Sequence, residues 1–222
     1  MRILSEVPDA AQAPGVVVMM HGPGLDRFLE DRVQELARHG YAAAAPDLYH
    51  RQPDDDVDTM TRAGRLRDDE IVADIDAVVA HLRGLARPRV TELAVLGFCM
   101  GGRNTYLAAG ARPGLWRAAV VFYGGNIMKP WGGERAPFEL TAQIACPVLG
   151  LFGLDDPNPS PADVDRIDGE LTRHGKPHEF HRYAGAGHAF LNFSNPERYR
   201  PEQARQAWQL ALDFLGRHLR RT

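Results

Sequence analysis

Two alternating patterns of apolar and polar positions run through most of the chain. Short, continuous apolar runs are typical of strands buried on both faces of a parallel sheet, and here they end at Gly, Pro or Asp. Between them, apolar residues recur three and four positions apart, as on one face of an amphipathic helix. These patterns predict strands at 15–20, 41–46 and 90–97, within 115–125 and 146–156, and from 178 onwards, and helices at 26–40, 71–86, 101–111, 162–175 and 201–219.

The regular alternation of strand and helix predicts an α/β fold. Strands joined through helices pair in parallel, so we expect a mostly parallel central sheet with helices on both faces, in three α/β/α layers. The polar segment 51–70 has weak periodicity, and we expect a surface excursion there with at most a short helix and with the aspartates at 54–56 in a solvated loop. No repeat or linker interrupts the pattern, which predicts a single domain over residues 1–222.

The composition narrows the classes of function. The net charge of −3 lacks the basic imbalance of nucleic-acid-binding proteins. The N-terminal stretch lacks the apolar core of a signal peptide, and no apolar run is long enough to cross a membrane. Two cysteines, Cys99 and Cys146, are too few for a disulfide scaffold. We therefore expect a cytoplasmic protein that binds neither nucleic acid nor a membrane.

Polar and reactive residues directly follow the predicted strands. Ligands of parallel α/β sheets bind beyond the carboxyl ends of the strands, so these residues are the candidates for function. In chain order they are His21, Gly22, Asp47, Cys99, Met100, Tyr123, Asp155, Asp156 and His188. A candidate nucleophile is followed by an acid and then by a histidine, which is the chain order of the α/β-hydrolases.

Cys99 lies within the sequence GFCMGG, between a predicted strand and a predicted helix. A nucleophile on such a sharp turn needs small residues two positions before and after it, because these two positions crowd together. Here they are Gly97 and Gly101. The turn lifts the sulfur to a helix N-terminus, where partial positive charge favours the thiolate. A buried apolar thiol is the alternative, which we expect instead for Cys146.

His188 follows the last predicted strand in a Gly-rich loop, the position of the catalytic base. It would hold the proton of the Cys99 thiol and later pass a proton to the leaving group. An acid would fix the tautomer of this imidazole, and both Asp155 and Asp156 follow the preceding strand. The spacing from Gly153 favours Asp156.

Backbone amides are expected to bind the oxyanion. The amide of Met100 follows the nucleophile, and the amide of Gly22 lies in the loop after the first apolar run. The side chain of His21 contacts the thiol or the substrate, or pairs only with backbone. Surface positions are expected for the arginines of the excursion, with the alternative that one of them neutralises an anionic substrate. These are Arg62, Arg65 and Arg67.

At this point the chain resembles the dienelactone hydrolase family of the α/β-hydrolase fold over nearly its whole length. The resemblance rests on VVVMMHGPGL, LARHGYAAAAPDLYHR, VLGFCMGGR, VVFYGG, LFGLDDPNPSP and YAGAGHAF. It implies a triad of Cys99, Asp156 and His188 that hydrolyses a small-molecule lactone or ester without a cofactor or metal. We expect a monomer or homodimer. A thiol-reactive redox protein and a non-catalytic ligand-binding protein are the alternatives.

Two positions depart from the pattern of this family. In its best-described members, a glutamate occupies roughly the place of His21, and an arginine that binds the substrate carboxylate occupies the place of Asn192. Together with Tyr123, these two residues are the expected further contacts of the substrate or nucleophile. The short N-terminal region predicts that the leading hairpin of the fold is reduced.

Overall fold

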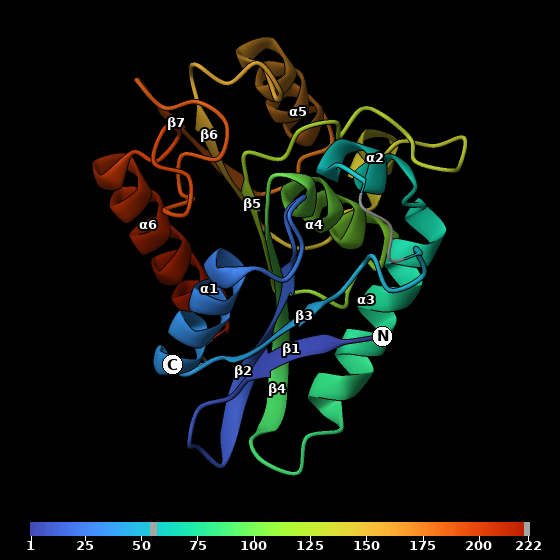
Figure 1. Cartoon of the computed structure of the whole chain (residues 1–222), viewed down its shortest axis with the longest axis vertical. Coiled ribbons are helices and arrows are strands. Elements are labelled where there is room, and N and C mark those ends of the chain that lie inside the picture. Colours follow the sequence, from blue (N-terminus) through green and yellow to red (C-terminus); the bar gives the residue numbers. More distant parts are fainter. Residues whose placement is uncertain (54–56, 220–222) are drawn as a thin grey trace.

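A single sheet organises the protein. The computed structural model describes residues 1–53 and 57–219, so the aspartates at 54–56, expected in a solvated loop, lie outside the described residues. The described strands are β1 (Ile3–Glu6), β2 (Gln12–Met19), β3 (Ala42–Pro46), β4 (Arg89–Phe98), β5 (Ala118–Phe122), β6 (Val148–Gly153) and β7 (His178–Tyr183). They form one sheet in the order β1-β3-β2-β4-β5-β6-β7 (Figure 1). β1 pairs antiparallel with β3 and all other neighbours pair in parallel, which confirms the expected mostly parallel sheet.

Helices cover both faces of this sheet. They are α1 (Arg27–Arg38), α2 (Thr59–Gly64), α3 (Asp68–Arg83), α4 (Met100–Ala111), α5 (Pro161–Arg173) and α6 (Pro201–Leu219), together with the 3-10 helix η1 (Pro137–Gln143). α1 and α6 lie on one side of the strands and α3 lies on the other (Figure 1). α4 packs against α3 and η1, and η1 packs against α5. The three-layer α/β/α arrangement is thereby confirmed.

The predicted strands and helices form because their apolar residues reach a common core. Val17 of β2 pairs with Ala44 of β3 and Val95 of β4, and all three side chains are fully buried. Both faces of the sheet are covered, so an uninterrupted apolar run is stable there. Asp26 is the N-cap of helix α1, and its carboxylate accepts a hydrogen bond from the Leu29 amide at 3.0 Å. Such a cap stabilises a helix by about 1 kcal/mol.

Two elements, β1 and η1, were not predicted from the sequence, and a third, α2, is the short helix expected in the polar excursion. β1 is half-buried at the edge of the sheet, so it carries no continuous apolar run. η1 is too short to show a period. α2 is the short helix of the polar excursion, and the side chain of Asp58 caps it by accepting from the amides of Met60 and Thr61. Within the described ranges, none of the helices combines the length and apolarity of a membrane span.

The parallel strands bring the candidate residues to one edge. β4 lies between β2 and β5, and Cys99 directly follows it at the start of α4. Gly22 comes shortly after β2, Tyr123 directly after β5 and Asp156 shortly after β6. Because parallel strands all end on the same side, segments far apart in sequence meet at this carboxyl edge.

Candidate active site

A sharp turn between β4 and α4 carries Cys99. Its backbone has φ 56° and ψ −119°, a conformation that a residue with a side chain adopts only under strain. A Cβ atom at Gly97 would lie 2.2 Å from the carbonyl oxygen of Gly101, and one at Gly101 would lie 2.0 Å from the carbonyl oxygen of Met19. Any larger residue at either position would therefore collide with backbone. The turn sets the sulfur at the N-terminus of α4.

Three side chains from separate segments meet at this turn. His188 Nε2 lies 2.9 Å from Cys99 Sγ, and His188 Nδ1 lies 2.9 Å from Asp156 Oδ2. Asp156 is only 2% exposed, and its other oxygen accepts a hydrogen bond from the Asn158 amide at 2.8 Å. Asp155 is exposed. Of the two aspartates that the sequence left open, the structure places Asp156 against the imidazole.

The surroundings of the thiol and the imidazole favour a charge on each. Burial acts against the Cys99 thiolate, but His188 and the amides of Met100 and Gly22 outweigh it and lower the pKa of Cys99. Burial likewise acts against the imidazolium, but hydrogen bonds with Asp156 and Cys99 raise the pKa of His188 to about 10. Both shifts favour the thiolate–imidazolium form of the pair over the neutral thiol and imidazole.

The backbone amides of Met100 and Gly22 act on the sulfur and help to lower the pKa of Cys99. Tyr49 connects the two segments that carry them. Its hydroxyl donates to the carbonyl oxygen of Gly22 at 2.7 Å and lies 3.7 Å from Met100 Sδ. Burial raises the pKa of Tyr49 to about 12, so this hydroxyl keeps its proton. Sequence reasoning missed Tyr49, and the segment APDLYHR was the available signal.

A cavity of about 590 Å³ opens beside Cys99. Helix α2 and the loops after β5, β6 and β7 supply most of its wall, so the polar excursion forms part of the site. Besides Cys99, the lining consists of Gly22, Pro23, Thr59, Met60, Ala63, Gly64, Met100, Gly125, Asn126, Trp131, Asp156, Pro157, Asn158, His188 and Arg198.

The family is decided by comparison with known proteins. The model of the "Dienelactone hydrolase family" matches residues 1–219. The chain belongs to this family. Membership makes it a hydrolase of the ester and lactone class, as the sequence resemblance implies.

Several members of the family and its fold are similar to this chain. A "Putative carboxymethylenebutenolidase" of Methylorubrum extorquens is 32% identical over 218 residues, which cover 92% of this chain and 72% of the relative. A "Probable 2-oxo-3-(5-oxofuran-2-ylidene)propanoate lactonase" of Bradyrhizobium is 31% identical over 212 residues, which cover 93% of this chain and 84% of the relative. The crystal structure of a "Putative Dienelactone Hydrolase" from Klebsiella pneumoniae has a TM-score of 0.82 at 28% identity and covers 97% of this chain and 99% of that one. The α/β-hydrolase fold is thereby shown.

His21, where the family pattern has a glutamate, lies outside the cavity lining. Its Nε2 atom is 2.8 Å from Asp26 Oδ1, and its ring packs against Phe28 with the ring centroids 5.3 Å apart. The expected contact with the thiol or substrate is not found in this geometry, and the side chain pairs with a carboxylate instead of backbone. The sequence indicated Asp26 only as the start of a helix, so it did not reveal this partner.

Tyr123 and Asn192, the other two expected contacts of the substrate or nucleophile, are also not among the residues that line the cavity. Tyr123 is buried with φ 38°, and its ring meets the His188 ring edge-on at 5.5 Å, so it packs against the back of the imidazole. Asn192 is turned into its own loop, where its side-chain oxygen accepts from the Ser194 amide at 2.9 Å. Tyr123 directly follows β5 and Asn192 lies in the loop after β7, and their side chains are engaged in packing and in turn formation.

The cationic side chain of the cavity wall comes from an unexpected segment. None of the three arginines of the excursion lines the cavity. Arg62 stacks over the Tyr49 ring at 4.3 Å, and Arg67 pairs with Asp69 at 3.3 Å. Arg198 lines the cavity instead, from the loop before α6. No strand or motif precedes it, so the sequence contained no signal for it.

Helix α4, which begins beside the nucleophile, also anchors the opposite wall of the cavity. Arg103 of α4 is fully buried and pairs with Asp68 at 2.6 Å. Its guanidinium carbon lies 3.8 Å from the centroid of the Trp131 ring, and Asp68 accepts a hydrogen bond from the Trp131 amide at 3.0 Å. Trp131, which lines the cavity, is thereby tied to Arg103 of α4 and to Asp68 at the start of α3.

Proposed function

We propose that this hydrolase cleaves a lactone or activated ester through a covalent thioester on Cys99, with His188 as the acid and base and Asp156 as the residue that orients it. The single observation that carries the proposal is the 2.9 Å contact between His188 Nε2 and Cys99 Sγ at the N-terminus of a helix. A thiol paired with an imidazole at such a position is an activated nucleophile.

In the acylation step, the Cys99 thiolate attacks the carbonyl carbon of the substrate. The carbonyl oxygen becomes an oxyanion, which the amides of Met100 and Gly22 bind in place of the sulfur. The imidazolium of His188 then protonates the leaving oxygen or enolate as its bond to the carbonyl carbon breaks. The products of this step are an alcohol or enol, a neutral imidazole and a thioester. In a lactone, both ends belong to the same molecule.

In the deacylation step, neutral His188 removes a proton from water, and the resulting hydroxide attacks the thioester carbonyl. The same two amides bind the second oxyanion. Its collapse breaks the carbon–sulfur bond, releases the carboxylic acid and restores the thiolate beside the imidazolium. Asp156 holds Nδ1 throughout, so Nε2 faces the sulfur in both steps. Because a thiolate leaves readily, we expect activated substrates rather than peptides.

The cavity supports a small, partly apolar substrate. Its volume of about 590 Å³ is in the range of small-molecule sites. Met60, Ala63 and Trp131 supply apolar surface, and Arg198 supplies a positive charge. The names of the two relatives point to enol-lactones, whose leaving enolate is stabilised. We therefore propose an enol-lactone or a comparably activated ester. We also infer one domain over residues 1–222, because one sheet and one hydrophobic core include the described elements.

The redox alternative receives no comparable support. A disulfide-forming mechanism needs a second thiol near Cys99, and the other cysteine of the chain, Cys146, is buried at the start of β6 on the opposite edge of the sheet. A ligand-binding protein without activity would not require a thiolate held by an imidazolium and two amides.

A panel of enol-lactones and aryl esters tests the proposal. The wild-type protein is expected to hydrolyse some members of the panel, whereas Cys99→Ala and His188→Ala lose turnover. Mass spectrometry of protein quenched during turnover is expected to detect the acyl group on the peptide that contains Cys99. Wild-type turnover without any acylated Cys99, together with full activity of Cys99→Ala, would show that the thioester mechanism is wrong.

A further inference from the structure

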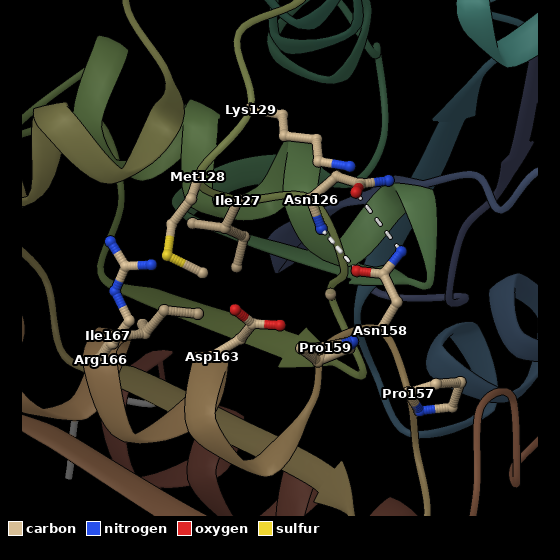
Figure 2. Close-up of a pocket in the computed structure, with 11 residues that line it drawn as sticks. Asn126, Ile127, Met128, Lys129, Pro157, Asn158, Pro159, Asp163, Arg166 and Ile167 are labelled. Carbon is tan, nitrogen blue, oxygen red and sulfur yellow. Dashed lines mark hydrogen bonds between the residues drawn. The ribbon is translucent and has the colours of Figure 1, made fainter.

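A second cavity of about 460 Å³ adjoins the catalytic one. The two cavities share Asn126, Pro157 and Asn158 in their walls, so they are neighbours along the carboxyl edge of the sheet. Figure 2 shows the second cavity between the loop after β5, above, and the first turns of α5, below. A substrate longer than the catalytic cavity would extend into this space.

The partition between the two cavities consists of two amide side chains. The Asn126 backbone amide donates to Asn158 Oδ1 at 3.2 Å, and Asn158 Nδ2 donates to Asn126 Oδ1 at 3.4 Å (Figure 2). Asn126 has φ 59°, and a Cβ atom at Gly125 would lie 2.7 Å from Asn158 Oδ1, so the contact is close and the backbone is specialised for it. Asn158 is exposed and Asn126 is half-buried, so solvent reaches this polar partition.

The charges in the second cavity favour an anion. Lys129 and Arg166 both line it, and within residues 1–53 and 57–219 no ion pair neutralises either of them. The lining also contains one carboxylate, Asp163, whose Oδ2 atom accepts from the Ser160 amide at 3.0 Å and from the Ser160 hydroxyl at 2.8 Å, so the two cationic side chains outnumber it. The lining between these charges is apolar and comes mainly from Ile127, Met128, Pro159 and Ile167.

We propose that this second cavity is a distal subsite for a carboxylate at the far end of the substrate's acyl group. Lys129 and Arg166 bind the carboxylate, and the aliphatic part of the acyl chain lies between Ile127 and Ile167. His188, which protonates the leaving oxygen, does not line the second cavity, so the acyl group is the part of the substrate assigned to it. The inference rests on the proposed ester hydrolysis and specifies the class of substrate, an ester of a dicarboxylic acid.

Matched pairs of esters test the distal subsite. The half-ester 4-nitrophenyl hydrogen adipate carries the distal carboxylate, and 4-nitrophenyl hexanoate is its neutral counterpart of equal length. In the double variant Lys129→Met, Arg166→Met, the ratio of KM for the half-ester to KM for the hexanoate is expected to rise about fivefold, with little change in the ratio of the kcat values, because two exposed charge contacts are lost. In the wild type, added salt is expected to raise the same KM ratio by screening.

The control is Arg173→Met, which removes an arginine from the same helix. Arg173 is exposed, pairs with Glu170 and does not line either cavity, so its loss leaves the KM ratio unchanged. Half-esters of succinate and suberate measure the distance between Cys99 and the subsite. The double variant is expected to raise the KM ratio most for the acid whose length matches this distance. An unchanged KM ratio in the double variant for all three acids overturns the subsite.

Binding to an inactive protein separates this inference from the proposed function. If the wild type hydrolyses neither these esters nor any member of the panel of enol-lactones and aryl esters, the proposed function fails. Titration of Cys99→Ala with adipate and hexanoate then decides the subsite, as it also does if only these esters are inert. Calorimetry is then expected to show tighter binding of adipate, and the addition of Lys129→Met and Arg166→Met is expected to abolish that preference. Equal dissociation constants of adipate and hexanoate for Cys99→Ala would overturn the subsite.

Discussion

The two cysteines of this chain lie at opposite edges of the same sheet. Cys99 follows β4 at the carboxyl edge, and Cys146 precedes β6 at the amino edge. Burial acts on both thiols in the same direction, against the thiolate. Nevertheless, the pKa of Cys99 is lowered, whereas burial raises the pKa of Cys146 to about 12.

The difference lies in what surrounds each sulfur. At the carboxyl edge, the N-terminus of α4 and the loop after β2 supply amides, and the loop after β7 supplies the imidazolium of His188. At the amino edge, Cys146 is followed by Pro147, which has no amide hydrogen to donate. The comparison teaches that the position in the sheet, through the donors that this position supplies, decides whether a buried thiol becomes reactive.

The largest expected effect comes from removing each thiol in turn. Cys99→Ala is expected to lower kcat/KM for an aryl ester by ~10⁴-fold or more, because the turn holds no other nucleophile. Cys146→Ala is the matched control and keeps kcat/KM within about twofold, while its small cavity lowers the free energy of unfolding by about 1 kcal/mol. Steady-state kinetics and chemical denaturation measure the two quantities. Equal losses of activity in the two variants would contradict the comparison.

The next largest effect concerns the carboxylate behind the imidazole. Asp156→Asn is expected to lower kcat by ~10³-fold, because an amide at Oδ2 favours the wrong tautomer of His188 and does not stabilise its charge. Asp155→Asn makes the same chemical change at the exposed neighbour and is expected to leave kcat within about twofold. Steady-state kinetics of both variants provide the measurement. A large loss in Asp155→Asn with none in Asp156→Asn would reverse the assignment of the acid.

A third effect is the pH dependence of alkylation by iodoacetamide. Because the pKa of Cys99 is lowered, its thiolate forms at lower pH than an ordinary cysteine and is lost as the pH falls through that lowered value, whereas Cys146 becomes a thiolate only near pH 12. At pH 7, Cys99 is therefore expected to react at least ~100-fold faster than Cys146. Peptide mapping by mass spectrometry measures both rates.

His188→Ala sharpens the same measurement. Without the imidazolium, burial dominates at Cys99 as it does at Cys146, so the midpoint of Cys99 alkylation is expected to move to higher pH. In the wild type, the ion pair is expected to persist until the pH approaches about 10, where His188 loses its proton. An unchanged midpoint in His188→Ala would mean that the helix N-terminus and the amides alone hold the thiolate.

The smallest effect tests how the amides are held. Tyr49→Phe removes the hydroxyl that donates to the Gly22 carbonyl oxygen and is expected to lower kcat about fivefold, since the loss corresponds to roughly 1 kcal/mol. Tyr106→Phe is the matched control, because that buried hydroxyl bonds to Thr141 Oγ1 at 2.7 Å away from the cavity lining. It is expected to lower stability by a similar amount without lowering kcat. A similar change in kcat in both variants would show a general effect of packing instead.

Much of the architecture could be predicted from local patterns. The run GVVVMM and the segment after Asp26 have the periods of a buried strand and of an amphipathic helix, and both form as expected. The edge strand β1 and the helix η1 could not be predicted, because a short element at an edge buries too few side chains to leave a pattern. The candidate site residues could be located from the same pattern, because each one follows the end of an apolar run that predicts a strand.

What such reasoning could not supply was the direction of each side chain. Tyr123 and Asp156 both follow a strand, yet the first packs behind the imidazole and the second binds it. Arg198 lines the cavity although nothing in its neighbourhood suggests a site, whereas Arg62 is held by an aromatic ring outside the lining. These outcomes depend on contacts between segments that are distant in sequence.

The sequence by itself determined the order of strands and helices, the strained turn at Cys99 and the edge of the sheet at which a site would form. These features follow from local sterics and from the period of apolar residues, which are properties of neighbouring positions. Only the tertiary structure decided which aspartate faces His188, which amides face the sulfur and which cavities adjoin it. Such choices arise from the packing of distant segments, and for the two thiols that packing determines whether burial or the surrounding donors control the charge.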